Sequence, residues 1–215
     1  MFDQSIFDRI QLNIQSSIRI EGSRVIYFDP WQIKNDPHDA DMIFITHEHY
    51  DHFSPEDIVR VANMNTYVVC PQMMINQVMA AINIPYDRFV GINPGQKKEI
   101  SRMMVEGVWA YNQRKPFHAK RNAWLGYIVT LDAVRYYVAG DTDATPDNRD
   151  VRCNVAFLPI GGVYTMDIKE AAILTRKITP EAVIPTHYGS IVGTPLDGEL
   201  FERMVPRGIE CRLYL

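Results

Sequence analysis

Apolar residues fall into short runs separated by polar turns, with amphipathic segments between some of them. Residues 12–20 (LNIQSSIRI) and 24–28 (RVIYF) are rich in β-branched residues, partly alternate, and flank the turn-forming residues 21–23. This pattern predicts an N-terminal hairpin. Residues 42–45 (MIFI) form an unbroken apolar run, which is typical of a buried strand.

The pattern after residue 53 indicates alternating helices and strands. Ser54 as N-cap and Pro55 at the first helical position, followed by two acids, predict a helix that ends near residue 63. Further strands are predicted at 67–70, 103–110, 124–130, 134–139, 155–160, 182–185 and 209–214, and further helices at 72–82, 166–177 and 196–205. No repeat, low-complexity tract or linker interrupts this order, so residues 1–215 are expected to form one mixed α/β domain.

Composition narrows the function classes. A chain of 215 residues that is 47% hydrophobic can bury a large core. Its 22 basic and 26 acidic residues give a net charge of -4, which offers no general basic surface for nucleic acid or acidic lipid. The sequence leaves the oligomeric state open.

Cysteine usage and the N-terminal residues bear on the compartment. Cys70, Cys153 and Cys211 lie far apart in apolar surroundings, which disfavours a disulfide framework or a CxxC zinc site. Residues 1–15 lack the basic and apolar regions of a signal peptide, and no apolar run is long enough to span a membrane. We therefore expect a soluble, cytoplasmic protein.

Three of the six histidines lie within positions 47–52, directly after the apolar run at 42–45. His47 and His49 share a face of an extended segment, and Asp51 and His52 lie on the following turn, so all four side chains can converge. Imidazole and carboxylate groups suit zinc and similar divalent ions. The alternative is a solvated polar loop, which we disfavour because unpaired polar groups at the end of a buried strand are costly.

The motif HxHxDH at the end of an apolar strand resembles the metal-binding signature of the metallo-β-lactamase superfamily. The resemblance continues downstream, where His118, Gly140-Asp141 and His187 follow in the order that this superfamily uses. Further local sequences resemble small, single-domain metal-dependent hydrolases related to the ascorbate-6-phosphate lactonase group: AYN at 110–112, AGDTD at 139–143, LPIGGVYTM at 158–166 and PTHYG at 185–189.

This resemblance implies a four-layer αββα sandwich and a binuclear centre of two divalent ions, Zn²⁺ in the first place and Mn²⁺ or Fe²⁺ as alternatives. The resemblance also implies that Asp51 and Asp141 are catalytic residues as well as metal ligands. A hydroxide between the ions would hydrolyse an ester, lactone or phosphodiester. The implied ligands are His47, His49 and His118 for one ion, Asp51, His52 and His187 for the other, and Asp141 as the bridge.

Two features of the segment 111–123 stay open. His118 occurs later than in many members of the superfamily, so either the loop folds back to deliver it or Asn112 contributes in its place. The segment also carries Arg114, Lys115, Lys120 and Arg121 and no acid. It is either a solvated loop or an electrostatic trap for a small anionic substrate.

Other functions within the same superfamily remain alternatives. A nuclease is disfavoured, because neither the length nor the charge leaves room for a segment that clamps nucleic acid. A di-iron redox protein would carry an appended flavin domain that this sequence lacks. A non-catalytic metal-binding or regulatory module would bind two ions without turnover.

Overall fold

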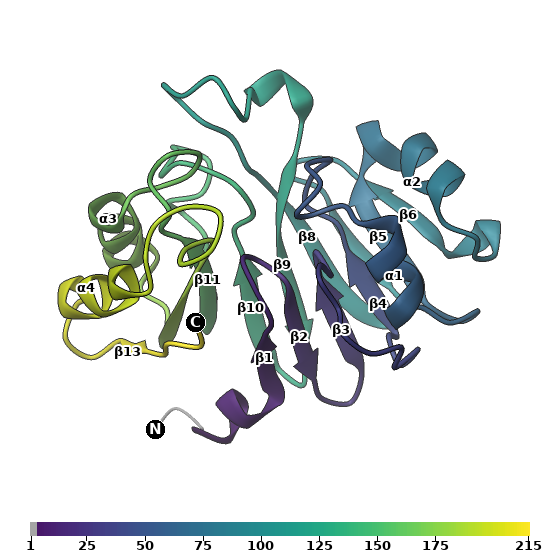
Figure 1. Cartoon of the computed structure of the whole chain (residues 1–215), viewed down its shortest axis with the longest axis horizontal. Helices are drawn as coiled ribbons and strands as arrows, with labels where there is room; N and C mark the ends of the chain where they lie inside the picture. Colours follow the sequence, from purple (N-terminus) through teal and green to yellow (C-terminus); the bar gives the residue numbers. More distant parts are fainter. Residues whose placement is uncertain (1–3) are drawn as a thin grey trace. The chain divides into compact units, whose positions relative to one another are not determined.

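Residues 4–215, the part of the chain that this computed structural model describes, form two mixed β-sheets with helices (Figure 1). Contacts divide the chain into two compact units, Met1–Asn93 and Pro94–Leu215, and each unit contains one sheet. In this part of the chain no helix is both long and apolar enough to cross a membrane.

The first unit contains a sheet in the order β1-β2-β3-β4-β5-β6. Its strands are β1 (Ile10–Leu12), β2 (Ile18–Glu21), β3 (Val25–Phe28), β4 (Met42–Phe44), β5 (Tyr67–Pro71) and β6 (Phe89–Ile92). The pairs β1–β2 and β2–β3 are antiparallel, and the remaining pairs are parallel. Its helices are η1 (Gln4–Arg9), α1 (Pro55–Val61), η2 (Gln72–Met74), α2 (Ile75–Ala81) and η3 (Tyr86–Arg88).

The hairpin predicted from residues 12–28 is confirmed at its turn, but its first strand is shorter than predicted. β2 and β3 pair on either side of residues 22–24. The predicted strand 12–20 instead reverses between Asn13 and Ser17, whose backbone groups hydrogen-bond each other. Gln15 takes a positive φ of 52° in this turn. Such a conformation is uncommon for residues other than glycine, so the pattern of β-branched residues does not predict it.

Two parallel strands of this sheet set the position of the histidine motif. β3 pairs with β4 in parallel, and Phe28 stacks on Phe44 with ring centroids 4.7 Å apart. The strands end together, since Phe28 and Phe44 are register partners. Asp29 and the histidine loop therefore follow them at the same edge of the sheet.

The second unit contains a sheet in the order β13-β12-β11-β10-β9-β8-β7. Its strands are β7 (Lys97–Ile100), β8 (Met103–Trp109), β9 (Leu125–Leu131), β10 (Val134–Val138), β11 (Val155–Pro159), β12 (Ala182–Thr186) and β13 (Glu210–Cys211). β7 to β10 pair antiparallel, and β10 to β13 pair in parallel. Its helices are η4 (Lys120–Asn122), α3 (Ile168–Ile178) and α4 (Leu196–Met204).

Most predicted elements of this unit are confirmed within a few residues, and the last predicted strand is much shorter than 209–214. α3 begins where its capping box requires, because Asp167 accepts from the Glu170 backbone and the Glu170 side chain accepts from that of Asp167. Leu158, Leu174 and Phe201, from β11, α3 and α4, belong to one buried cluster. This cluster fixes the parallel strands β11 and β12 under the helices.

Candidate metal centre

The first unit gathers one half of the predicted ligand set in the loop that follows β4. His47, Asp51 and His52 are buried, and His49 is half-buried. His47 Nε2 lies 3.0 Å from His49 Nδ1, and His52 Nε2 lies 3.5 Å from Asp51 Oδ2. The HxHxDH motif thus places its ligand-type atoms in two close pairs, the division that the family resemblance implies.

Asp29 and Thr46 orient this loop from behind. The Asp29 carboxylate accepts from the Thr46 backbone N–H at 2.8 Å, from the Thr46 hydroxyl at 2.6 Å and from His52 Nδ1–H at 2.7 Å. The Thr46 oxygen lies 3.0 Å from His47 Nδ1. Burial raises the pKa of Asp29, while its contacts with His52 and Thr46 oppose that rise. Asp29 ends a strand as a similar aspartate does in the superfamily that the sequence resembles, so its supporting role is predicted from the sequence, whereas no spacing rule distinguishes Thr46.

The helix start predicted at Ser54 holds the other end of the loop. The backbone N–H groups of His52 and Phe53 donate to His49 O, and α1 then begins at Pro55 with Ser54 as N-cap. The Asp57 carboxylate accepts from the Ser54 hydroxyl and from the backbone N–H groups of residues 32 and 33. A short, rigid turn therefore connects the strand to the helix.

The second unit gathers the other half of the predicted ligand set around Asp141. Asp141 follows β10 and the positive-φ Gly140, and His187 follows β12 with a positive φ of its own. Asp141 Oδ2 lies 3.2 Å from His118 Nε2 and also 3.2 Å from His187 Nε2. One carboxylate oxygen between two imidazole nitrogens, all buried, is a donor set that suits a divalent metal ion.

The segment 111–123 folds back and delivers His118, as one of the two sequence hypotheses requires. The Asn112 backbone N–H donates to His118 O at 2.7 Å, and the His118 N–H donates to Asn112 Oδ1 at 3.1 Å. Asn112 and His118 are both buried. His118 therefore lies beside Asp141, and Asn112 hydrogen-bonds to His118 instead of taking its place.

Two of the four basic residues of this segment are bound to acids. Lys115 Nζ donates to Asp143 Oδ1 and to Thr165 O, both at 2.7 Å. Lys120 Nζ lies 2.7 Å from Asp147 Oδ2, and this contact holds the pKa of Asp147 below its ordinary value. The charges of Lys115 and Lys120 thus stabilise the loop. The exposed basic residues that remain are Arg114 and Arg121.

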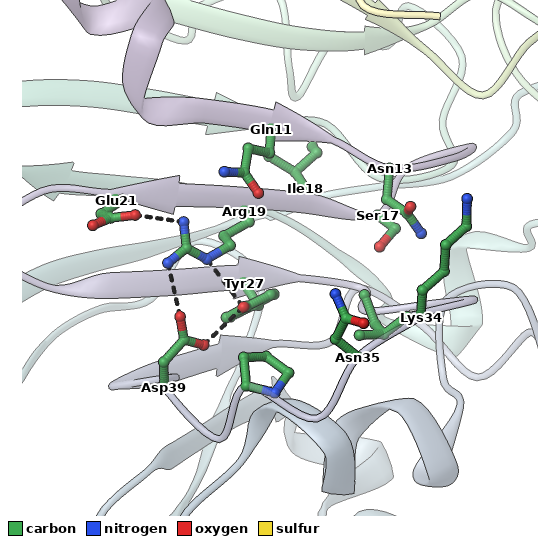
Figure 2. Close-up of a pocket in the computed structure, with 12 residues that line it drawn as sticks. Gln11, Asn13, Ser17, Ile18, Arg19, Glu21, Tyr27, Lys34, Asn35 and Asp39 are labelled. Atoms are coloured by element: carbon green, nitrogen blue, oxygen red, sulfur yellow. Dashed lines mark hydrogen bonds and ion pairs between the residues drawn. The ribbon is translucent and has the colours of Figure 1, made fainter.

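A separate pocket of about 470 Å³ lies over β1 to β3 of the first unit (Figure 2). Arg19 lines this pocket and donates to Glu21 at 2.6 Å, to Asp39 at 2.7 Å and to the Tyr27 hydroxyl at 3.0 Å. The Tyr27 hydroxyl in turn donates to Asp39, and burial raises the pKa of Tyr27. Because Asp39 belongs to the loop at 33–39 while Arg19 and Tyr27 belong to β2 and β3, the network ties this loop to the strands.

Comparisons with known proteins agree with this architecture. The family model of the β-lactamase superfamily domain matches residues 16–188. A UPF0173 metal-dependent hydrolase of Pyrococcus horikoshii is 32% identical over 200 residues, covering 86% of this chain and 87% of the relative. One of Thermococcus onnurineus is 30% identical over 202 residues, covering 88% of each chain.

Solved structures give the same fold. A structure from Parabacteroides distasonis has a TM-score of 0.78 and 29% identity, and the match covers 95% of this chain and 91% of that one. Igni18, a metallo hydrolase from Ignicoccus hospitalis, has a TM-score of 0.74 and 22% identity, covering 95% and 93% of the two chains. The latter likeness is one of fold alone.

The two mixed sheets with their helices are therefore those of the metallo-β-lactamase fold, which confirms the predicted fold class. The chain belongs to the metallo-β-lactamase superfamily, among the UPF0173 metal-dependent hydrolases, and it is a metal-dependent hydrolase. The relatives described above carry the UPF0173 name, which is not that of the ascorbate-6-phosphate lactonase group.

Proposed function

We propose that the two units form one catalytic domain, in which their ligand clusters together hold two divalent ions and hydrolyse a small anionic ester, lactone or phosphodiester. The family match supports this, because it spans both units. The observation that carries it is the recurrence, in each unit, of buried imidazole nitrogens and carboxylate oxygens at close range. The proposed ligands are His47, His49, Asp51, His52, His118, Asp141 and His187, each of which offers one ligand atom.

A pair of divalent ions would supply Lewis acidity and a hydroxide nucleophile at neutral pH. The chain's own residues would bind and orient. Asp141 would be shared, since its Oδ2 already faces two imidazoles, and Asp29 with Thr46 would fix the rings of His47 and His52. Zn²⁺ is the first choice of ion for this imidazole-rich set, with Mn²⁺ and Fe²⁺ as alternatives.

The preference for an anionic substrate is carried by Arg114 and Arg121, the two exposed basic residues of the segment that delivers His118. Exposed guanidinium groups attract carboxylate and phosphate groups and can bind them in bidentate fashion. Lys115 and Lys120 contribute less, because acids already neutralise them. The local resemblance to lactonases of phosphorylated sugar acids puts lactones and phosphate esters first among the substrates to test.

Metal content measured together with activity tests the catalytic proposal. The purified chain should hold two equivalents of Zn²⁺ or Mn²⁺ and turn over at least one member of a panel of lactones, esters and phosphodiesters. Asp141→Ala should lose both metal and turnover. Asp147→Ala removes a carboxylate of the same unit whose partners among residues 4–215 are Lys120 and Tyr111, and it should keep both. Two bound metals without turnover across the panel would favour a regulatory module instead.

Arginine substitutions test the substrate charge. Arg114→Ala and Arg121→Ala should raise KM for the active substrate several-fold and leave kcat nearly unchanged, and added salt should shrink the difference. Lys120→Ala is the matched control, because Asp147 already compensates its charge. If KM in Arg114→Ala and Arg121→Ala equals that of the wild type and of Lys120→Ala, the electrostatic trap is ruled out.

A further inference from the structure

The side chain of Asn112 is a buried amide held between His118 and Asp143. Its Nδ2 donates to Asp143 Oδ1 at 3.0 Å and to Tyr164 O at 2.9 Å. Its Oδ1 lies 2.9 Å from His118 Nδ1 and accepts from the His118 backbone N–H. The amide is therefore hydrogen-bonded on both sides.

These partners determine which way the amide points. A carboxylate and a backbone carbonyl can only accept hydrogen bonds, so the group facing them must be the donor Nδ2. Asp143 cannot turn away, because Lys115 Nζ binds the same Oδ1 at 2.7 Å and the Gln113 N–H donates to its Oδ2 at 2.9 Å. Asn112 must consequently present Oδ1, an acceptor, to His118.

This orientation fixes the proton on the imidazole of His118. Nδ1 faces two acceptors, Asn112 Oδ1 at 2.9 Å and Tyr164 O at 3.1 Å, so Nδ1 must carry the ring proton. Nε2 faces one acceptor, Asp141 Oδ2 at 3.2 Å, whereas Nδ1 faces two at shorter range, so the single proton of a neutral ring resides on Nδ1 and the lone pair on Nε2. That lone pair is the one a metal ion needs, directed at the carboxylate that would share the ion.

We propose that Asn112 is a positioning residue, which acts through His118 by fixing its tautomer and ring orientation and does not itself bind the metal. The hydrogen-bonded chain Lys115–Asp143–Asn112–His118 then explains why the half-buried Lys115 pairs with the buried Asp143. The need for the Nε2 lone pair rests on the proposed metal-binding function. The tautomer itself is a property of the metal-free chain and stands independently.

Nitrogen-15 NMR of metal-free chain labelled on histidine tests the tautomer directly, with His118→Gln used to assign the His118 signals. The neutral wild-type ring should show the Nδ1–H tautomer. Asn112→Ala should shift the population to Nε2–H or a mixture. The same variant should bind Zn²⁺ about 10–100-fold more weakly in chelator competition.

Asn148→Ala is the matched control. Asn148 is also buried in the same unit, but its side chain accepts from the Thr145 N–H and donates to Asp143 O and Thr142 Oγ1 rather than bonding to His118. Its truncation should cost stability and leave the His118 tautomer and the Zn²⁺ affinity unchanged.

Asn112→Asp is unsuitable as a second variant, because it would set a carboxylate oxygen against the acceptors Asp143 Oδ1 and Tyr164 O. If Asn112→Ala fails to fold, the wild-type spectrum alone decides the tautomer. An Nε2–H ring in the wild type, or an unchanged tautomer in folded Asn112→Ala, would overturn the assignment. If the wild type instead shows Nδ1–H but binds no metal, the proposed function fails while the positioning result stands.

Discussion

Replacing Asp29 by asparagine should separate metal binding from folding. The carboxylate accepts three hydrogen bonds, two from Thr46 and one from His52, and it is fully buried. An asparagine of the same shape can keep the backbone N–H bond, and the Thr46 hydroxyl can rotate to accept. The new NH₂ group, however, would face His52 Nδ1–H donor to donor.

The conflict resolves if the His52 proton moves from Nδ1 to Nε2, which would occupy the lone pair needed for a metal ion. Hydrogen bonds to a charged acceptor contribute about 1.5–3 kcal/mol and neutral ones about 1 kcal/mol, so the free energy of unfolding should fall by about 1–3 kcal/mol. Metal affinity should fall about 10–100-fold, the usual effect of losing a partner that orients a ligand.

Asp57→Asn is the matched control for Asp29→Asn. Asp57 also accepts two backbone N–H groups and one hydroxyl in the same unit, but its partners are Gln32, Ile33 and Ser54, none of which is a histidine. Urea denaturation of the metal-free variants should show similar losses of stability, and chelator competition should show weakened Zn²⁺ binding for Asp29→Asn alone. Equal Zn²⁺ affinity in both variants would show that the contact between Asp29 and His52 does not control metal binding.

Three further predictions concern stability and reactivity. Gly126→Ala should destabilise the chain by about 1–3 kcal/mol in urea denaturation, because its Cβ would lie 2.6 Å from Ala139 O, a backbone atom that cannot move aside; an unchanged midpoint would contradict this. Burial raises the pKa of Glu106, but its contacts with Lys97 and Arg135 outweigh burial and hold this pKa below its ordinary value. A carboxyl with a lowered pKa stabilises the fold above its unfolded pKa of about 4.3, and this stabilisation is lost as pH falls through the folded pKa. Glu106→Gln should therefore lower the free energy of unfolding at pH 7 and lower it less at pH 3. Burial raises the pKa of the Cys70 thiol to about 12, so a thiolate-specific reagent at pH 8 should label it only after unfolding.

The candidate ligands could be predicted from sequence because their signals are local. His47 to His52 follow an apolar strand at fixed spacing, and Ser54-Pro55 marks the helix start that closes the turn. The order of motifs in the superfamily then implies His118, Asp141 and His187.

The support of those ligands could not be predicted, because it depends on how loops close in space. Asn112 and Asp143 are 31 positions apart, and their contact exists only once the segment after β8 folds back beside the loop after β10. The turn at Gln15 was missed for a related reason: its positive φ is fixed by hydrogen bonds between Asn13 and Ser17 and by burial, not by a glycine that the sequence displays. The predicted assembly of residues 1–215 into one domain stays a prediction.

Anomalous diffraction from crystals grown with Zn²⁺ would locate the ions and their ligands. We expect two anomalous peaks per chain, both near Asp141, with ligand distances of about 2.0–2.2 Å to histidine nitrogens and carboxylate oxygens. His47, His49 and His118 should surround one peak, and Asp51, His52 and His187 the other. A single peak, or peaks bound by residues of only one unit, would contradict a binuclear centre shared by the two halves of the chain.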